Sequence, residues 1–550
     1  MINRCPSCGG FLRYDIASGK LRCESCASEL LPEEYRDEHE AEEIQQGVME
    51  TTIFTCPACG GEVTAGTLDA VGYCSFCGGE VTLESRMAKI RRPDRIVPFT
   101  VTEEECREAY RKALKKAPFV PGSLKKDRYL EKFRSIYVPY WSYEVEYGPH
   151  ATLDSYEETR KGNYIYKKHW TLDVDYEAKV ANQLYDASSA LDDNISGEMT
   201  SAALQGETRP FSSSYLFGVY TDTADLDGNL YRQDARWDAN NELEERMSRD
   251  KELLWDKKLA LPEKGRSRAY GMQDMKEPEL LLLPVWFLTW RKKDKVAYSL
   301  VNGKTGEVAA ELPQSFLRFL LGSLLISVPV FFILNLGLTL MPSVILAVAA
   351  VLSAAILDQY EGQLKQIHAR INHLDDKGYL AAKKQSYAEA DTRKHKQYVL
   401  GGPKKQWEKR KERASSISEY LVFLSVILIV CLIMDMSEVY TFLENRIVLA
   451  IVFVICDGLA VLFLSDILSR KYQGCVPLAG RLLDVSGVVF SLVLGQIIVF
   501  INPPEDWIYW CAVVLSLLGV ILAISGMVRE FNLLVTRPVP HFFDRGGDKT

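Results

Sequence analysis

The sequence has little histidine and lacks the common catalytic motifs. Only seven of its 550 residues are histidines, and no two of them have the spacing of a metal-ligand pair. The chain contains no G-x-S-x-G hydrolase turn, no P-loop and no G-x-G-x-x-G segment behind a predicted strand. One carboxylate pair, Asp173 and Asp175, falls on a single face of a predicted strand, where such side chains usually face solvent. These absences predict a protein that is not an enzyme.

The chain also lacks an excess of positive charge. Its 65 Lys and Arg residues are outnumbered by 73 Asp and Glu residues, which excludes a strongly basic protein that coats nucleic acid. The mean hydropathy of −0.07 suggests a soluble protein, but this value averages over unlike regions. Residues 1–90 contain 7 basic and 15 acidic side chains, residues 91–314 contain 35 and 38, and residues 315–550 contain 23 and 20. Three physically different regions are therefore joined in one chain.

Eight of the 13 cysteines form two copies of one pattern near the N-terminus. Each copy has a C-x2-C pair, 14 intervening residues and a second C-x2-C pair; the cysteines are Cys5, Cys8, Cys23 and Cys26 in the first copy and Cys56, Cys59, Cys74 and Cys77 in the second. Two such pairs on opposed hairpins place four thiolates at the corners of a tetrahedron, the arrangement that Zn2+ prefers. Because four protein ligands leave no open position, we expect two structural zinc ions.

A disulfide framework and an iron–sulfur cluster are the alternatives to zinc at these cysteines. No signal peptide precedes Cys5, and C-x2-C pairs fit zinc better than secretory disulfides. Zinc ribbons often bind nucleic acid, which requires a basic face. Because residues 1–90 are acidic and each zinc–thiolate centre adds about two negative charges, we expect a protein-docking module and no binding of nucleic acid.

The first part of the chain divides into four predicted segments, which are zinc ribbon 1 at 1–32, an acidic helical linker at 33–50, zinc ribbon 2 at 51–90 and an α+β cytosolic domain at 91–314. Charge and hydrophobic patterns in this domain predict helices at 102–117 and 234–254 and strands at 137–147 and 164–185. Two strands begin with a Pro-x-Trp motif, at Pro139 and Pro284. The motifs suggest equivalent positions at sheet edges, with coincidence as the alternative.

The last part of the chain predicts an all-α membrane domain of about six helices. Its apolar stretches lie at 316–336, 339–357, 419–434, 447–469, 482–501 and 507–527. These stretches define a transmembrane hairpin at 315–357, a basic helical cytosolic loop at 358–418, four transmembrane helices at 419–527 and a cytosolic tail at 528–550. The loop 358–418 contains 14 Lys and Arg residues, whereas the loops on the opposite side contain only Arg446. By the positive-inside rule, both termini are cytoplasmic in a multi-pass protein of the cell membrane.

Two features of the membrane part predict contacts. The basic run at 404–413 precedes a predicted span and is expected to attract anionic lipids. Asp457 lies near the middle of a span, where a carboxylate is costly and often functional. A helix-packing hydrogen bond or protonation of this carboxylate is the structural explanation that we favour. With Asn335 and Gln496, Asp457 supports the alternative of a transporter or channel.

The motifs resemble those of a known bacterial family. The two Cys-Pro-x-Cys-Gly-Gly segments, Arg95-Ile96-Val97-Pro98-Phe99, Val138-Pro139-Tyr140-Trp141, the segment from Pro210 to Gly218, and Leu283-Pro284-Val285-Trp286 with Asn302-Gly303-Lys304-Thr305-Gly306 are similar to TFIIB-type double zinc-ribbon membrane proteins of Firmicutes. The resemblance covers residues 1–312 and implies metal ligation by the eight cysteines. It also implies partners of the SPFH-domain or phage-shock type and a role in envelope stress.

The sequence therefore predicts a multidomain protein with two small β zinc ribbons, an α+β soluble domain and a polytopic membrane domain. We expect a non-enzymatic scaffold or adaptor that recruits cytosolic proteins to the bacterial inner membrane. A transporter or channel subunit with a zinc-ribbon regulatory domain is one alternative. A membrane-tethered transcription regulator is the other.

Overall fold

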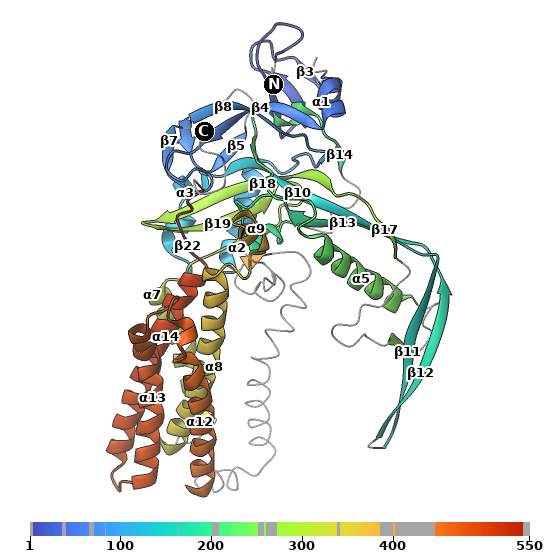
Figure 1. Ribbon diagram of the computed structural model, residues 1–550. Helices are drawn as coiled ribbons and strands as arrows, with labels where there is room; N and C mark the ends of the chain where they lie inside the picture. The colour runs from blue at the N-terminus through green and yellow to red at the C-terminus, as the bar shows by residue number, and fades with distance from the viewer. Residues whose placement is uncertain are drawn as a thin grey trace.

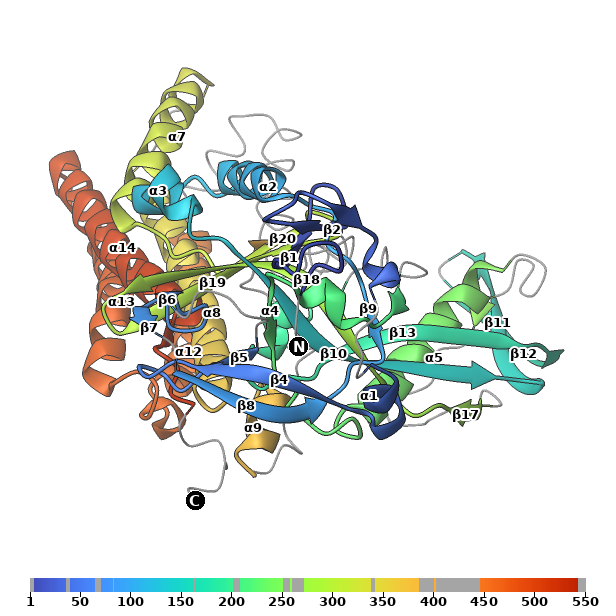
Figure 2. The ribbon, with the colours of Figure 1, turned by 90° about the horizontal axis from the view of Figure 1, so that it is seen from above.

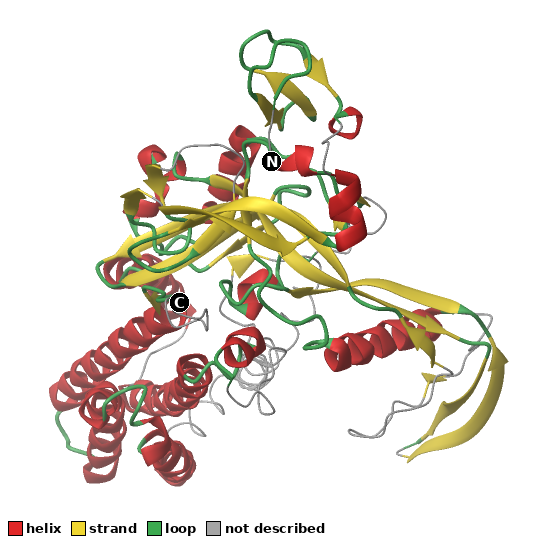
Figure 3. Ribbon diagram, turned by 45° about the horizontal axis from the view of Figure 1, so that its top comes forward, coloured by secondary structure: helices red, strands yellow, loops and turns green. Residues whose placement is uncertain are grey.

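The computed structural model describes residues 4–35, 40–64, 71–82, 84–162, 164–200, 208–250, 258–259, 272–337, 342–384, 400–401 and 446–542. Figure 1 shows two cysteine-containing units at the top, a long twisted sheet below them, and a bundle of helices that extends away from the sheet. A two-stranded ribbon projects on the other side of the molecule. Figure 3 shows how the sheet, in yellow, runs across the whole molecule between these parts.

The first cysteine unit is a small antiparallel sheet of strands β1 (Leu12–Asp15), β2 (Lys20–Cys23) and β3 (Glu29–Leu30). A 3-10 turn, η1 (Pro32–Glu34), and a short helix, α1 (Glu40–Gln46), follow it. The acidic stretch 33–50 was predicted as a helical linker. Among the described residues of this stretch the helix covers Glu40–Gln46, and the next strand begins at Val48.

The second cysteine unit and the middle of the chain share one 14-stranded sheet. Its main path consists of β21 (Leu400–Gly401), β20 (Val308–Ala310), β19 (Lys295–Asn302), β18 (Glu279–Lys292), β10 (Arg134–Tyr147), β15 (Tyr220–Asp222), β5 (Glu62–Thr64), β4 (Val48–Thr55) and β8 (Glu84–Arg91). The unit joins the domain where Thr221 and Asp222 pair with Thr64 and Val63. The hydrogen-bonded ladder thus continues across the predicted boundary at residue 90.

Smaller elements complete the α+β domain. These are β6 (Val71–Tyr73), β7 (Glu80–Thr82), β9 (Arg95–Ile96), α2 (Glu103–Lys115), η2 (Gly122–Lys125), α3 (Asp127–Leu130), β11 (His150–Lys161), β12 (Tyr164–Asp175), β13 (Ala178–Asp186), α4 (Asp193–Ser196), β14 (Arg209–Pro210), η4 (Ser213–Leu216), α5 (Arg232–Arg249), β16 (Lys258–Leu259) and β17 (Met272–Met275). Helix α2 begins where the sequence predicts, because Thr102 and Glu105 cap it reciprocally.

The two Pro-x-Trp motifs lie in the centre of the sheet and not at its edges, where the sequence placed them. Strands β10 and β18 are antiparallel neighbours, so Pro139 faces Leu282 and Pro284 faces Tyr137. Each proline lies at the point where the neighbour on the other side of its strand changes. The neighbour of β10 is β15 before Pro139 and β13 after it, and the neighbour of β18 is β9 before Pro284 and β19 after it. Because proline has no N–H to donate, it fits a position without a ladder partner for that group.

The C-terminal helices are α7 (Phe316–Gly337), α8 (Pro342–Ile371), α12 (Arg446–Ile467), α13 (Leu478–Ile501) and α14 (Asp506–Leu534). Among the described residues, four of them are long and apolar enough to cross a membrane, namely α8, α12 from Leu449, α13 and α14. Helix α7 covers the first predicted stretch, but its apolar run Phe316–Pro329 is shorter. The predicted stretch 419–434 and the basic run 404–413 lie outside the described residues.

Helices α13 and α14 pack through small residues. A Cβ atom added to Gly487 would lie 2.2 Å from the carbonyl oxygen of Gly519, so only glycine permits this approach of the two backbones. The Ser491 and Ser516 hydroxyls meet one turn away. Large aliphatic side chains such as Leu518, which is 52% exposed, cover the outside of the bundle. The close backbone contact through small residues and the exposed apolar side chains on the outside suit a lipid environment.

Three short elements link the bundle to the sheet or join its helices: α9 (Lys377–Ala382), η5 (Arg470–Tyr472) and β22 (Arg537–Pro538). Strand β22 follows α14 and pairs with β19, through Val296 and Arg537. The chain therefore returns to the α+β domain after its last apolar helix.

Candidate metal centres and the contacts around them

The eight predicted ligands come together as two groups of four cysteines. Within each group the sulfur atoms all lie within 4.8 Å of one another. The measured Sγ–Sγ distances are 3.8 Å for Cys5–Cys26 and 3.5 Å for Cys8–Cys23, and those in the second group are 3.9 Å for Cys56–Cys77 and 3.7 Å for Cys59–Cys74. A disulfide needs about 2.05 Å. All eight cysteines are free, so each group can hold a metal ion.

The local backbone explains why the cysteines converge. The residue after the second cysteine of each C-x2-C pair has positive φ, which turns the chain back over the sulfur atoms. These residues are Gly9, Ala27, Gly60 and Gly78. The N–H of Gly10 lies 3.4 Å from Cys8 Sγ and that of Gly61 lies 3.4 Å from Cys59 Sγ. Such N–H···S contacts orient and stabilise a thiolate ligand.

The first unit lies on the segment 210–218, one of the segments that carried the family resemblance. The Tyr14 N–H donates to the Phe217 carbonyl at 2.7 Å. The Tyr215 hydroxyl donates to Glu33 at 2.7 Å, and this hydrogen bond lowers the pKa of Glu33. Leu12 and Leu21 of the unit belong to the same buried cluster as the core of the α+β domain. Even so, Cys8 and Cys26 stay exposed.

The second unit is enclosed on several sides, and all four of its cysteines are buried. The Tyr298 hydroxyl of β19 donates to the Phe76 carbonyl at 2.8 Å. The segment after β22 covers the other side: the Phe542 N–H donates to the Cys59 carbonyl at 2.6 Å, and its ring lies 5.5 Å from that of Phe76. The second cysteine unit and the segment at Phe542, which are far apart in the chain, therefore build this centre together.

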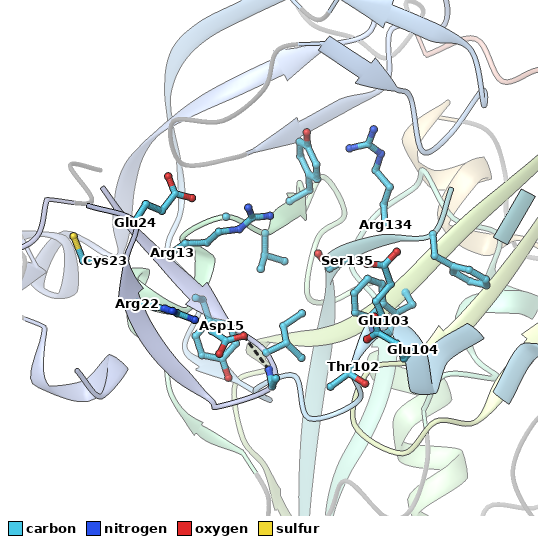
Figure 4. Close-up of a pocket in the computed structure, with 18 of the residues that line it drawn as sticks. Arg13, Asp15, Arg22, Cys23, Glu24, Thr102, Glu103, Glu104, Arg134 and Ser135 are labelled. Atoms are coloured by element: carbon cyan, nitrogen blue, oxygen red, sulfur yellow. Dashed lines mark hydrogen bonds between the residues drawn. The ribbon is translucent and has the colours of Figure 1, made fainter. Parts of the chain in front are cut away.

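An open groove of about 730 Å³ separates the first unit from the α+β domain. In Figure 4, Arg13, Asp15 and Arg22 approach it from the strands of the unit, while Glu103 and Arg134 approach from the domain. The groove thus presents side chains of both charges. Four aromatic residues also line it, namely Tyr14, Phe133, Tyr220 and Trp286.

Two arginines from the bundle form a buried ion-pair group with the α+β domain. Arg370, at the end of α8, and Arg537, after α14, both donate to Oε1 of Glu311, at 2.7 Å and 2.6 Å. Asp192 lies 3.6 Å from each guanidinium. Burial would raise the pKa of Asp192, but the two arginines lower it below its ordinary value. Removal of one partner would leave an unpaired buried charge, which costs about 3–5 kcal/mol, so the group couples the position of the domain to that of the bundle.

Helix α9 makes a second connection between the bundle and the domain. The Lys377 N–H donates to Asp193 at 2.8 Å, and Lys377 Nζ bonds Asp234 of α5 at 2.6 Å. The Tyr231 hydroxyl also donates to Asp193. Burial raises the pKa of Asp193 to about 6 and lowers that of nearby His373 to about 4. These contacts hold the chain that leaves α8 against the soluble domain.

The bundle gathers polar side chains that the sequence did not single out as a group. Asp457, which the sequence did single out, is half-buried on α12. The Tyr360 hydroxyl lies 3.1 Å from Asp484 and 2.7 Å from Glu530, and Arg529 contacts Asp484 at 2.6 Å. Glu530 is fully buried. The sequence signal for this group was an acid near one end of each of two apolar stretches. A search for charges in the middle of a span does not find such residues.

The carboxylate pair noted in the sequence contacts the opposite strand of the β11–β12 ribbon. Asp173 accepts from Thr152 at 2.8 Å, and Asp175 lies 2.9 Å from His150. The Asp175 side chain is 92% exposed. Both are cross-strand contacts at the base of the β11–β12 ribbon.

Comparison with known proteins gives one distant similarity. The chain is 23% identical over 335 residues to "Uncharacterized protein YdjG" of Bacillus subtilis (strain 168), and the match spans 57% of this chain and 90% of that protein. No family model matches the chain, and no solved structure matches it. The resemblance to TFIIB-type double zinc-ribbon proteins therefore stays a prediction from the motifs.

Proposed function

We propose that this protein is a membrane-anchored adaptor with two structural zinc ions. The cysteine units and the α+β domain form a cytosolic platform, the apolar helices hold it in the bacterial inner membrane, and the platform docks protein partners. The observation that carries the proposal is the open groove between the first unit and the domain. Both of its walls are positioned by the fold, and they offer charged and aromatic side chains without the ligand set of a catalytic metal.

The sulfur geometry supports the proposal of zinc. A tetrahedron with Zn–S bonds of about 2.3 Å has edges of about 3.8 Å. The four measured Sγ–Sγ distances, 3.5–3.9 Å, agree with that edge. With four thiolates the ion would stabilise each unit and orient its strands, and it would have no position free for substrate. Elemental analysis of the purified protein should find two zinc ions per chain, and iron at that stoichiometry would contradict the assignment.

The charge distribution along the bundle supports an orientation with the platform in the cytosol. Lys365, Arg370, Arg470, Arg481 and Arg529 all lie towards the α+β domain, near the ends of α8, α12, α13 and α14. The opposite ends of α13 and α14 are joined by a turn that contains Glu505 and no basic residue. This asymmetry is the pattern of a cytoplasmic face next to the domain. Both termini, and any partner-recruiting surface, would then be cytoplasmic.

A charge-reversal experiment on the groove tests the adaptor function. Arg22 lies on β2 and lines the groove, whereas Lys20 of the same strand pairs with Glu29 outside it. The tagged full-length protein is crosslinked in native membranes, purified, and compared as wild type, Arg22→Glu and Lys20→Glu. We expect the main crosslinked partners to be lost from Arg22→Glu and kept in Lys20→Glu. Identical partner sets in all three proteins would contradict docking in the groove.

The polar group inside the bundle favours one other function, that of a transporter or channel subunit. Tyr360, Asp484 and Glu530 would then bind or relay a cation or proton. Ion flux through proteoliposomes tests this alternative, with Glu530→Gln as the variant. Flux that the wild type supports and Glu530→Gln abolishes would favour transport over a purely adaptor role.

A further inference from the structure

A basic surface of the α+β domain extends from the end of α2 through η2 to the start of α3. Residues 115–128 contain five Lys and Arg residues and one acidic residue, Asp127, whereas the whole chain has a net charge of −8. Asp127 pairs with Arg111 of α2 at 2.6 Å. The five basic residues, which define this basic surface, are all exposed: Lys115, Lys116, Lys125, Lys126 and Arg128. Their positive charge therefore faces the surroundings of the protein.

Buried side chains fix the basic surface on the domain. Tyr110 and Leu114 of α2, Leu124 of η2 and Leu130 of α3 all belong to the main buried cluster of the α+β domain. The Tyr110 hydroxyl also lies 3.3 Å from the Ser299 hydroxyl of β19. Because these side chains face the core, the basic residues next to them in the sequence lie on the outer side. The positive charges therefore have a defined position relative to the domain.

The segment in the middle of the basic surface contacts the beginning of α7. The Ser315 N–H donates to the Phe119 carbonyl at 2.8 Å, and the Arg318 guanidinium donates to the Val120 carbonyl at 2.8 Å. The apolar run of α7 begins at Phe316, directly between these two contacts. The basic residues before and after this segment therefore flank the point where the chain enters the apolar helix.

The contacts of α14 place this point at the depth of lipid headgroups. The Gln314 N–H donates to Asn532 Oδ1 at 2.7 Å, and Asn532 Nδ2 donates to the Gln314 carbonyl at 2.9 Å. Asn532 lies about 4.5 Å along the helix beyond Arg529, the first basic residue after the apolar part of α14. The headgroup layer extends about 5–8 Å beyond the hydrocarbon core on each side. Gln314, and Ser315 beside it, therefore lie within the thickness of that layer.

The views of the whole molecule agree with this placement. In Figure 1, α2 and α3 lie at the end of the bundle that faces the sheet. Figure 2, from above, shows α3 beside α7, with α2 next to α3. Arg470 and Arg481 also lie towards this end of the helices, as the cytoplasmic side of a bundle requires. An anionic leaflet at this depth is the partner that complements the charge of the basic surface.

We propose that the basic surface binds the headgroups of anionic phospholipids in the cytoplasmic leaflet, next to the beginning of α7. The inference rests on the membrane placement of the bundle in the proposed function. The headgroups would attach the α+β domain to the leaflet beside the transmembrane helices. Because α2 and α3 are anchored in the core of the domain, this attachment would hold the domain and its groove in a fixed orientation to the membrane.

Site-specific photocrosslinking to lipid tests the proposal. The photoreactive residue p-benzoylphenylalanine replaces exposed Ser123 of η2, or Leu518 on the outside of α14, or exposed Phe11 on the first cysteine unit. Each full-length protein is reconstituted into vesicles of phosphatidylglycerol and phosphatidylcholine in equal parts or of phosphatidylcholine alone. Mass spectrometry then quantifies lipid adducts. We expect adducts at positions 518 and 123 and none at position 11, with a lower yield at position 123 in phosphatidylcholine alone.

Charge reversal on the basic surface provides the second arm. Lys115→Glu with Lys116→Glu should reduce the adduct at position 123 in anionic vesicles by about fivefold or more. Lys115→Arg with Lys116→Arg keeps the charge and should keep the adduct. Arg86→Glu with Lys89→Glu is the matched control, because both residues are exposed on β8, away from the bundle, and it should leave the adduct unchanged.

The outcomes separate the basic surface from the membrane placement. An adduct at position 518 without one at position 123 overturns lipid binding by the basic surface and leaves the bundle in the membrane. No lipid adduct at position 518 overturns the membrane placement, and the proposal with it. Equal yields at position 123 in both kinds of vesicle, unaffected by charge reversal, overturn the recognition of anionic headgroups. If position 123 crosslinks to a protein in native membranes and to no lipid, the surface docks a protein and the proposal is wrong.

Discussion

The two cysteine units have the same ligand spacing and the same turn geometry, but they differ in how the rest of the chain packs around them. In the first unit Cys8 and Cys26 are exposed, and the unit touches the domain through one side. In the second unit all four cysteines are buried between the sheet and the segment that contains Phe542. The motif therefore determines where a metal can bind, whereas long-range packing determines how accessible that metal is.

The largest expected effect separates the units by their role in folding. Cys74→Ser should remove one zinc ion and destabilise the α+β domain, because β5 of the second unit is part of the main sheet. Cys8→Ser should also remove one ion but leave the domain folded. Structural zinc contributes about 10–16 kcal/mol in small zinc-binding peptides, so the local loss is large in both cases. Limited proteolysis of the detergent-solubilised protein distinguishes them. Equal protease sensitivity of the two variants would contradict this difference.

Metal release should proceed in two phases. A chelator or thiol reagent reaches exposed Cys8 and Cys26 directly, whereas the second centre must first open locally. We expect the first ion to leave at least about tenfold faster than the second, as followed with a colorimetric zinc indicator. Cys8→Ser should lack the fast phase. A single phase in the wild type would show that burial of the second centre does not protect it.

Removal of the aromatic cover should make the rate of metal release from the second centre more similar to that from the first. Phe542→Ala deletes the ring that lies 5.5 Å from Phe76. Such aromatic pairs contribute about 0.5–1.5 kcal/mol beyond burial, so the slow phase should become about 2 to 13 times faster. His541→Ala, at the exposed neighbouring position, is the control. The fast phase should be unchanged in both variants.

The smallest expected effect concerns the turns. Ala27 is the one residue with a side chain among the four positive-φ positions after the cysteine pairs, at φ 56°. Ala27→Gly should stabilise the first unit by about 1 kcal/mol, and Gly60→Ala should destabilise the second by a similar amount. Zinc competition titrations measure both changes. Destabilisation by Ala27→Gly, or stabilisation by Gly60→Ala, would contradict this prediction.

The sequence predicted the features that depend on local pattern. The eight ligands follow from their spacing, and helix α2 follows from the Thr102–Glu105 cap and the charges of its first and last turns. Strand β10 follows from the alternation after residue 136. In each case the residues that determine the structure are close together in the chain.

The features that the sequence did not predict depend on residues far apart in the chain. In the sequence, Glu311 is an isolated acid between two apolar segments. Its pairing with Arg370 and Arg537 depends on the fold of the bundle. The central position of Pro139 and Pro284 likewise depends on which strands change neighbours around them. Local propensity disfavours proline in a central strand, so only knowledge of the sheet order could have placed it.

The contact between Phe542 and Cys59 has a consequence for the order of assembly. Cys59 is synthesised early, and its cover is synthesised only after α14, the last apolar helix, has been made. Until Phe542 has been made, the second centre therefore lacks the cover on one side, whereas β19 of the sheet can already pack on the other side. Metal can load during this interval, and its later protection reports that the helical bundle has been completed. A chain arrested before Phe542 would leave this side of the centre open to chelators and proteases.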